Sequence, residues 1–247
     1  IAYVSRVGES AGKMYGFVYD GTYKEEDFNI TVNENGKKTY ELKPGVPKFK
    51  DGCQPGDPKY KNVDGSEDNL ITDNDRTVIG NGHPLHTGGF TNNFVYKNWD
   101  LNIFLQWSYG NDIFNVNRLV MENPGAKKQL NQFASYKNRW SESNPTSNIP
   151  RVRAVGADEY SSLYVEDGSF LKLKTISLGY NFDAKTLKRI GISAARVFVS
   201  AENIATITGY SGSDPEVSTR HSVLTPGFDW SAYPRAFNAS LGVNVTF

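Results

Sequence analysis

Alternation of apolar and polar residues is the clearest pattern in this sequence, and it is strongest at the C-terminus. Between residues 236 and 247 the odd positions are Phe237, Ala239, Leu241, Val243, Val245 and Phe247, and the even positions are small or polar. A period of two places successive side chains on opposite faces of a β-strand. Sandwich strands usually have about five or six residues, whereas about 9–11 residues cross a bilayer as a tilted strand. The pattern therefore predicts a membrane-crossing strand with Phe237, Leu241, Val243, Val245 and Phe247 facing lipid.

Similar alternation predicts further strands. Residues 99–107 alternate and have Trp99 and Trp107 at the two ends of an apolar face, as in the aromatic girdles of membrane barrels. The remaining strand-like segments are residues 14–19, 88–96, 170–182 and 195–201, with a hairpin at 28–42 around Asn35-Gly36.

The connections between the main strands differ in length and alternate along the chain. Residues 97–98 and 183–193 are short connections, whereas 109–169 and 203–235 are long and polar, with a short helix expected at 127–140. Outer-membrane barrels combine short periplasmic turns with long extracellular loops. The expected fold is therefore all-β, an antiparallel transmembrane β-barrel with long outer loops at about 109–169 and 203–235.

Composition limits the alternatives. The chain has 247 residues, with 27 Lys plus Arg and 27 Asp plus Glu, so its zero net charge predicts no nucleic-acid partner. A mean hydropathy of −0.52 indicates a soluble protein at face value. Barrel strands nevertheless alternate and never build a long apolar run. A single cysteine excludes an intrachain disulfide and a cysteine-based zinc cluster.

Several ordered segments resemble one family. They are Pro55-Gly56-Asp57, residues 72–81, Tyr96–Leu101, Val165–Leu173, Val199–Asn203, Tyr210-Ser211-Gly212, Asp214-Pro215-Glu216 and Tyr233-Pro234-Arg235. Together they resemble the C-terminal part of SusC/RagA-type TonB-dependent outer-membrane transporters of Bacteroidetes. The resemblance implies that residues 1–247 are the C-terminal portion of a large plugged barrel of about 22 strands, without its plug and N-terminal strands.

The resemblance also implies function and partners. We expect part of an outer-membrane importer of oligosaccharides or peptides that works with a SusD-like surface lipoprotein. The other expected partners are the remaining barrel and plug, the TonB complex through the absent N-terminal part, and outer-membrane lipid or lipopolysaccharide. No nucleophile elbow or phosphate-binding loop is present, so no enzyme is expected. A soluble extracellular carbohydrate-binding β-sandwich is the alternative, and a secreted glycan hydrolase is a third interpretation.

Two sets of loop residues are candidate sites. Family members often have an EF-hand-like run where this chain has the oxygen-bearing residues Asn62, Asp64, Asp68 and Asp73, so calcium is the candidate cofactor. The spacing is longer than in that motif and no bidentate Glu occupies the twelfth position, so a solvated acidic turn is the alternative. Loop aromatics that suit stacking on a ligand, or packing of the loops themselves, are Trp140, Tyr164, Tyr210 and Trp230.

Overall fold

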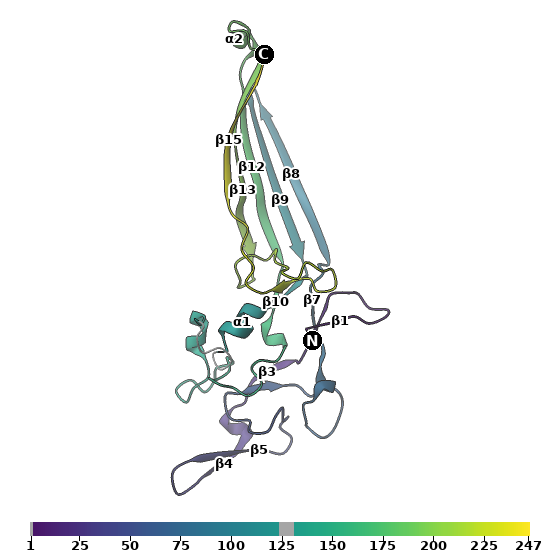
Figure 1. The fold of residues 1–247 in the computed structure, drawn as a ribbon, viewed down its shortest axis with the longest axis vertical. Helices are drawn as coiled ribbons and strands as arrows, with labels where there is room; N and C mark the ends of the chain where they lie inside the picture. The colour runs from purple at the N-terminus through teal and green to yellow at the C-terminus, as the bar shows by residue number, and fades with distance from the viewer. Residues whose placement is uncertain (1, 124–130) are drawn as a thin grey trace. The chain divides into compact units, whose positions relative to one another are not determined.

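The computed structural model describes residues 2–123 and 131–247, and most of its regular structure is antiparallel β-sheet (Figure 1). The chain divides into two compact units, which are described separately. The sheet unit comprises His83–Asp112, Asp167–Val217 and Ala232–Phe247; the loop unit comprises Ile1–Gly82, Ile113–Glu166 and Ser218–Ser231. No helix in the described ranges is long and apolar enough to span a membrane.

The sheet unit is one five-stranded antiparallel sheet in the order β15-β13-β12-β9-β8. Its strands are β8 (His86–Tyr96), β9 (Trp99–Tyr109), β12 (Phe170–Asn181), β13 (Ala194–Thr208) and β15 (Asn238–Thr246). Figure 1 shows these long strands running side by side. The alternation therefore located all five strands, and the structure confirms an antiparallel β-architecture. The edges at β8 and β15 are open, so the described strands do not close a barrel.

Connections of different length leave the two ends of this sheet. At one end a tight turn connects β8 to β9, and the backbone of Lys97 in this turn is left-handed, with a φ of 52°. Helix α2 (Ala184–Lys188), capped by the Asp183 side chain, joins β12 to β13 at the same end, where the C-terminus also lies (Figure 1). The two long connections leave β9 and β13 from the opposite end because neighbouring strands are antiparallel. The sheet thus separates short from long connections.

Strand β13 corrects one predicted boundary. It continues to Thr208, six positions into the loop expected at 203–235. Asn203 adopts a φ of 53° beside the register shift that falls between Leu173 and Thr175 of β12. A β-bulge interrupts the regular alternation of side chains while strand pairing continues beyond it. The alternation in the sequence therefore stops before the end of the strand.

The region 109–169 is more ordered than a plain loop. It contains β10 (Asp112–Asn115), α1 (Val116–Met121), the short 3-10 helices η3 (Ala134–Asn138) and η4 (Ser162–Tyr164), and β11 (Val165–Asp167). The helix expected at 127–140 appears only as η3, and its first residues, 127–130, lie outside the described part of the chain.

Short strands and turns make up the rest of the loop unit. Its elements are β1 (Tyr3–Val4), β2 (Lys13–Gly16), β3 (Tyr19–Thr22), η1 (Glu25–Asp27), β4 (Phe28–Val32), β5 (Lys38–Leu42), β6 (Pro58–Tyr60), η2 (Asp73–Asp75), β7 (Thr77–Asn81) and β14 (Phe228–Asp229). The predicted strand 14–19 is split between β2 and β3, whereas the predicted hairpin is confirmed as β4 and β5.

Aromatic side chains form the small cores of the loop unit. Phe17, Phe49 and Tyr60 pack at ring-centroid separations of 4.9–5.3 Å, and Tyr23 packs edge-on against Phe28 at 5.8 Å. Edge-to-face pairs of this kind add stability beyond their buried area. Aromatic contacts therefore substitute for long regular elements in this unit.

A fully buried carboxylate joins two distant segments of the loop unit. The Asp57 carboxylate accepts backbone N–H groups from Gln54 at 2.9 Å and Val155 at 3.1 Å, and it is ion-paired with Arg151 Nε at 2.6 Å. Burial raises the pKa of Asp57, although these partners act in the opposite direction. Such a carboxylate is stable only while its partners remain in place.

Candidate functional site

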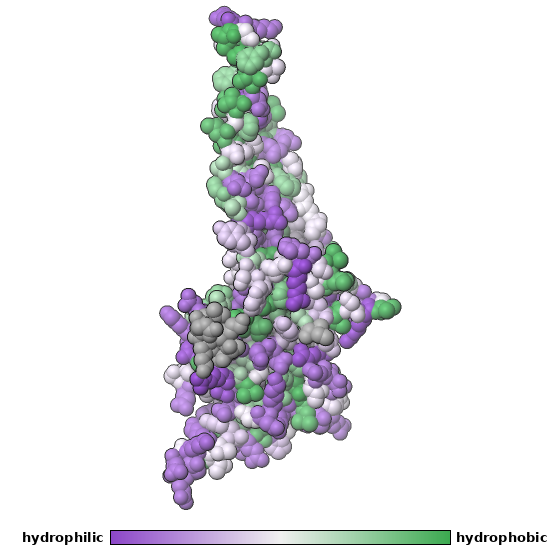
Figure 2. Space-filling model, in the orientation of Figure 1, coloured by the Kyte–Doolittle hydropathy of each residue, from purple (hydrophilic) through white to green (hydrophobic). Residues whose placement is uncertain are grey.

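One face of the sheet unit is apolar, and the strand register extends it across all five strands. In one row Phe94, Leu101, Leu178, Val199 and Leu241 lie opposite one another on successive strands. Four of these side chains are 42–74% exposed, and Leu101 is half-buried. Exposed apolar patches that run over several elements mark interaction or membrane surfaces. We call this surface the apolar face; Figure 2 shows hydrophobic and polar residues side by side along the sheet.

Aromatic rings lie toward both ends of the apolar face. At one end Trp99 packs against Tyr180 with ring centroids 4.9 Å apart. At the other, Trp107 Nε1–H donates to His86 Nδ1 at 3.2 Å, and the His86 ring stacks on Tyr109 at 5.1 Å. Rings with a polar edge suit the boundary between lipid and water. The paired tryptophans of the sequence therefore lie toward opposite ends of the apolar face, and their place in interfacial girdles stays a prediction.

The predicted lipid-facing residues of the last strand are all exposed. Leu241, Val243 and Val245 lie in β15 and are 74%, 61% and 42% exposed. Phe237 and Phe247, at 61% and 87% exposed, flank the strand immediately outside its ends. The structure thus supplies the exposed surface that lipid contact needs, and the contact itself stays a prediction.

The opposite face of the sheet, here the polar face, carries hydrogen-bonding groups in close contact. Arg196 Nε and Nη2 bind the Asp100 carboxylate at 3.1 and 2.5 Å, and Asn181 Nδ2 donates to the same carboxylate at 2.9 Å. A Cβ on Gly179 would lie 2.3 Å from the Arg196 guanidinium. A side chain at position 179 would therefore require the end of the Arg196 side chain to shift from this place.

A buried ionic cluster lies near the other end of the polar face. Lys172, on β12, is only 2% exposed; its ammonium contacts Glu216 directly and lies 3.5 Å from Asp214 Oδ1. Lys174 Nζ and Arg235 Nε approach the same Glu216 oxygen at 3.6 and 3.5 Å. We call these five residues the ionic cluster. Sequence reasoning missed it, although the Asp-Pro-Glu motif and a lysine on a polar strand face were visible signals.

The four candidate ligand aromatics are divided between the two units of the chain. Trp140, Tyr164 and Trp230 belong to the loop unit, and Tyr210 belongs to the sheet unit. Tyr164 and Tyr210 are 2% and 5% exposed, which leaves almost no ring surface for a sugar. Trp140 packs on Gly56, where a Cβ would lie 2.5 Å from the indole, and Trp230 is 43% exposed. Tyr164, Tyr210 and Trp140 thus have packing contacts within the protein, and ligand contact at any of the four stays a prediction.

The candidate calcium ligands Asn62, Asp64, Asp68 and Asp73 are occupied by local contacts. Asp64 accepts the Ser66 N–H and Asp68 accepts the Ser66 hydroxyl, both at 2.8 Å. Asn62 Nδ2 donates to Ser66 Oγ at 3.2 Å, and Asp73 is ion-paired with Arg76 at 2.9 Å. Throughout the residues that the structure describes, no three His, Cys, Asp or Glu side chains converge to hold a metal. Calcium binding stays a prediction that this geometry does not support.

Asp75, which sequence reasoning did not single out, organises this acidic loop. Its side chain is fully buried, and it accepts backbone N–H groups from Val63 at 2.8 Å, Asp64 at 3.2 Å and Thr72 at 2.7 Å. The conformation of the loop is therefore held by hydrogen bonds from its backbone to the Asp75 carboxylate.

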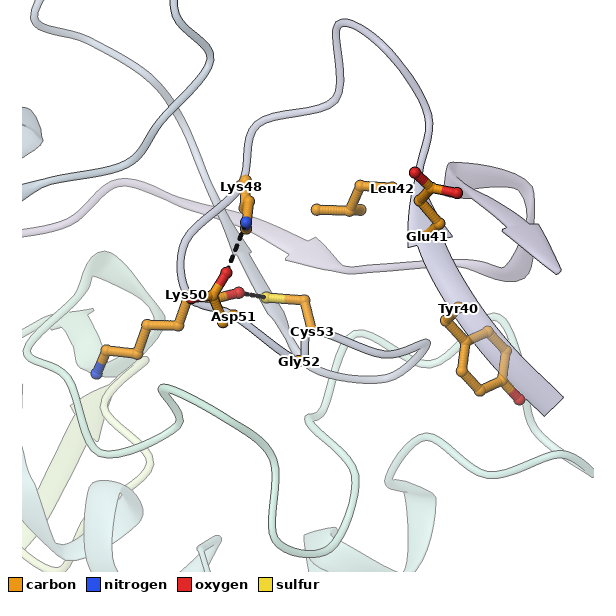
Figure 3. A pocket seen from close by; sticks show the side chains of 8 residues that line it. All are labelled: Tyr40, Glu41, Leu42, Lys48, Lys50, Asp51, Gly52 and Cys53. Carbon is orange, nitrogen blue, oxygen red and sulfur yellow. Dashed lines mark hydrogen bonds and ion pairs between the residues drawn. The ribbon is translucent and has the colours of Figure 1, made fainter. Parts of the chain in front are cut away.

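A hollow of about 320 Å³ lies beside the β5 strand in the loop unit (Figure 3). It is lined by Tyr40, Glu41, Leu42, Lys48, Lys50, Asp51, Gly52 and Cys53. Lys48 points at Asp51 and pairs with it at 2.6 Å, and the Cys53 thiol donates to the Lys50 carbonyl at 2.9 Å. Burial raises the pKa of Cys53. The thiol is therefore poorly suited to nucleophilic chemistry.

The two contrasting faces define a class of protein. A sheet with an exposed apolar side and a hydrogen-bonded polar side has the organisation of β-structured outer-membrane proteins, whose strands alternate between lipid and a polar interior. No protein-family model matches the chain.

The relatives are TonB-dependent receptors. The chain is 33% identical over 249 residues to TonB-dependent receptor P3 of Formosa agariphila, covering 99% of this chain and 23% of that receptor. It is 31% identical over 248 residues to receptor P26 of the same organism, covering 98% and 23%. Identity to TonB-dependent receptor SusC of Bacteroides thetaiotaomicron is 29% over 164 residues, covering 64% and 15%.

A solved structure agrees in fold. The chain matches the RagAB peptide importer in the "closed-closed" state with a TM-score of 0.71 and 21% identity, covering 100% of this chain and 24% of that chain. The chain is thus homologous to SusC/RagA-family TonB-dependent receptors, and it spans about 23% of the length of the curated relatives P3 and P26. Such receptors are outer-membrane transporters, so the predictions of an outer-membrane location and of no enzymatic activity are confirmed.

Proposed function

We propose that this chain is the C-terminal part of the membrane barrel of a TonB-dependent importer. In this proposal the apolar face contacts lipid, with Phe237, Leu241, Val243, Val245 and Phe247 as its C-terminal contribution. The remaining strands of the same receptor pair with the open edges at β8 and β15. Homology over about a quarter of the relatives' length supports a part rather than a whole transporter.

The exposed apolar face is the observation that carries the proposal. Rows such as Leu178, Val199 and Leu241 remain 42–74% exposed. A soluble β-sandwich packs such a face against a second sheet about 10 Å away. Within the described ranges, no second sheet buries this row. The soluble carbohydrate-binding sandwich therefore leaves the apolar surface unexplained, whereas a membrane covers it.

The proposal is tested by the dependence of the protein on detergent. The full-length polypeptide that carries these residues is extracted from membranes and then exchanged into buffer with or without detergent above its critical concentration. We expect a monodisperse species only with detergent. A monodisperse, folded species in plain buffer would exclude the barrel assignment and favour the sandwich.

We further propose that the cargo is an oligosaccharide or a peptide, taken up together with a SusD-like surface lipoprotein and with energy from the TonB complex. Similarity to SusC and the structural match to a peptide importer support this cargo range. The polar face would line part of the route. Cells with and without the receptor should differ in uptake of labelled oligosaccharides or peptides, and loss of TonB should abolish the difference. If cells with and without the receptor took up equal amounts of both the oligosaccharides and the peptides, the proposal would be contradicted.

A further inference from the structure

The ionic cluster connects three segments that are distant in the sequence. Lys172 lies on β12, Asp214 and Glu216 lie in the stretch that follows β13, and Arg235 lies in the stretch that leads into β15. All of them belong to the sheet unit. The connection from β13 to β15 is therefore tied to a third strand through its charges.

Asp214 is the point at which the two stretches of this connection meet. Its Oδ1 accepts the Glu216 N–H at 3.0 Å, and its Oδ2 accepts the Arg235 N–H at 3.1 Å. The Lys172 ammonium reaches the same carboxylate at 3.5 Å. The Asp214 carboxylate thus closes the Asp-Pro-Glu turn, binds the stretch that leads into β15 through Arg235, and binds β12 through Lys172.

The burial of Lys172 makes this arrangement more than a surface ion pair. Its side chain is 3% exposed, and those of Asp214 and Glu216 are 8% and 10% exposed. Exposed ion pairs contribute little to the stability of a fold. A buried ammonium requires charged partners, and the fold is strongly destabilised when they are removed. Gln106 Nε2 adds a further contact to Glu216 at 3.4 Å. The contacts therefore act together to fix the connection in one position.

Exposure along the polar face is uneven. Near the ionic cluster Phe170 and Lys172 are 8% and 2% exposed, whereas Asn181 and Asn244, toward the other end, are exposed. Side chains of the polar face are therefore covered near the ionic cluster and accessible to a polar solute toward the far end.

We propose that the ionic cluster is a clasp, in which Lys172 is a positioning residue that holds the connection between β13 and β15 over the polar face and so limits the size of the polar cargo that can pass. This role rests on the proposed function. It requires the clasp to act on residues 209–217 and 232–236 while the five strands stay paired.

The clasp is tested in the full-length receptor with Lys172→Met, which keeps the length of the side chain and removes its charge. Lys188→Met is the matched control, because the Lys188 side chain is exposed on α2, outside the ionic cluster. Hydrogen–deuterium exchange should speed up at least about tenfold in residues 209–217 for Lys172→Met, with no change in the strands. Lys172→Arg should restore most of the protection. Unchanged exchange in a folded Lys172→Met receptor would overturn the clasp.

The consequence for transport is measured with a length series of the oligosaccharide or peptide that the wild-type receptor takes up. Lys172→Met should shift the upper size limit while the shortest cargo enters as before. An unaltered size profile together with faster exchange would overturn the role in cargo selection. If Lys172→Met fails to fold, Glu216→Gln serves the same comparison. Should the wild type import neither cargo class, the proposed function fails, whereas the exchange experiment still decides the clasp.

Discussion

Replacing Leu241 by Arg tests the lipid-facing assignment with a magnitude that follows from the structure. Leu241 precedes Phe247 by six positions, which is about 20 Å along a strand at ~3.4 Å per residue. A tilt of about 40° converts this to roughly 15 Å of depth, within a few ångströms of the middle of an apolar band about 25 Å tall. An Arg at that depth costs about 2–4 kcal/mol, or about 30- to 700-fold in the folding equilibrium.

Ser240→Arg is the matched control, because Ser240 is the preceding residue of β15 and lies opposite Ser200 on the polar face. Both variants of the full-length receptor are refolded into lipid vesicles across a urea series, and the folded fraction is read from heat-modifiable gel mobility. Leu241→Arg should lose the stated stability, and Ser240→Arg should stay within about 0.5 kcal/mol of the wild type. Equal losses in the two variants, or no loss in Leu241→Arg, would refute the facing assignment.

Three further predictions concern the clasp, the loop unit and the single thiol. Burial alone would raise the pKa of Asp214, but the N–H groups of Glu216 and Arg235 and the Lys172 ammonium outweigh it and hold the pKa below 3.8. The side chains of Lys174 and Arg235 approach the neighbouring Glu216 carboxylate. The stabilisation of the clasp by the charged Asp214 carboxylate should therefore be complete above pH 3.8 and decrease at lower pH. Hydrogen exchange in residues 209–217 should become faster only below about pH 4, and faster exchange already at pH 6 would contradict this. Arg151→Met should destabilise the loop unit by about 3 kcal/mol, because it leaves the Asp57 carboxylate buried without its ion-pair partner, and limited proteolysis should then cleave near residue 57 sooner; unaltered cleavage would contradict the account. Cys53, 6% exposed and with its pKa raised by burial, should react with a maleimide only after denaturation, and rapid labelling of the native protein would show that the thiol is accessible.

Much of the sheet unit could be predicted from the sequence, because a strand that separates two environments records both in its alternation. Residues 99–107, apart from Phe104, and residues 236–247 display this pattern, and they correspond to β9 and β15. The hairpin at 28–42 also followed from local signals, since Gly36 takes a φ of 74° in its turn. These features depend on neighbours in the sequence, which is why the pattern reveals them.

Features that depend on tertiary contacts were not accessible in the same way. The end of β13 at Thr208 is hidden behind the bulge at Asn203, and the order within 109–169 arises from short elements packed on distant ones. The partners of Lys172 lie more than forty positions away in the sequence. The sequence shows a lysine on a polar strand face and an Asp-Pro-Glu motif, but only the tertiary structure shows that they meet and that the lysine is buried.

The candidate sites show the same limit. Oxygen-bearing residues in the loop 62–75 made calcium a candidate beside a solvated acidic turn, and in the structure Asp75 accepts three backbone N–H groups of the loop. Tyr164 was a ligand candidate because it lies in a long polar segment, yet its ring is buried and its hydroxyl donates to the Ala157 carbonyl at 3.1 Å. Composition predicts which chemistry a loop can offer, whereas burial decides whether that chemistry is exposed.

Site-directed spin labelling of β15 tests the central claim most directly. In the full-length receptor with Cys53→Ser, a nitroxide is attached at Leu241→Cys or at Ser240→Cys, and its collisions with oxygen and with a water-soluble nickel chelate are measured in lipid vesicles. A sheet that faces lipid with its apolar side predicts high oxygen and low nickel accessibility at position 241, with the reverse order at position 240. Equal nickel accessibility at the two positions would contradict the account.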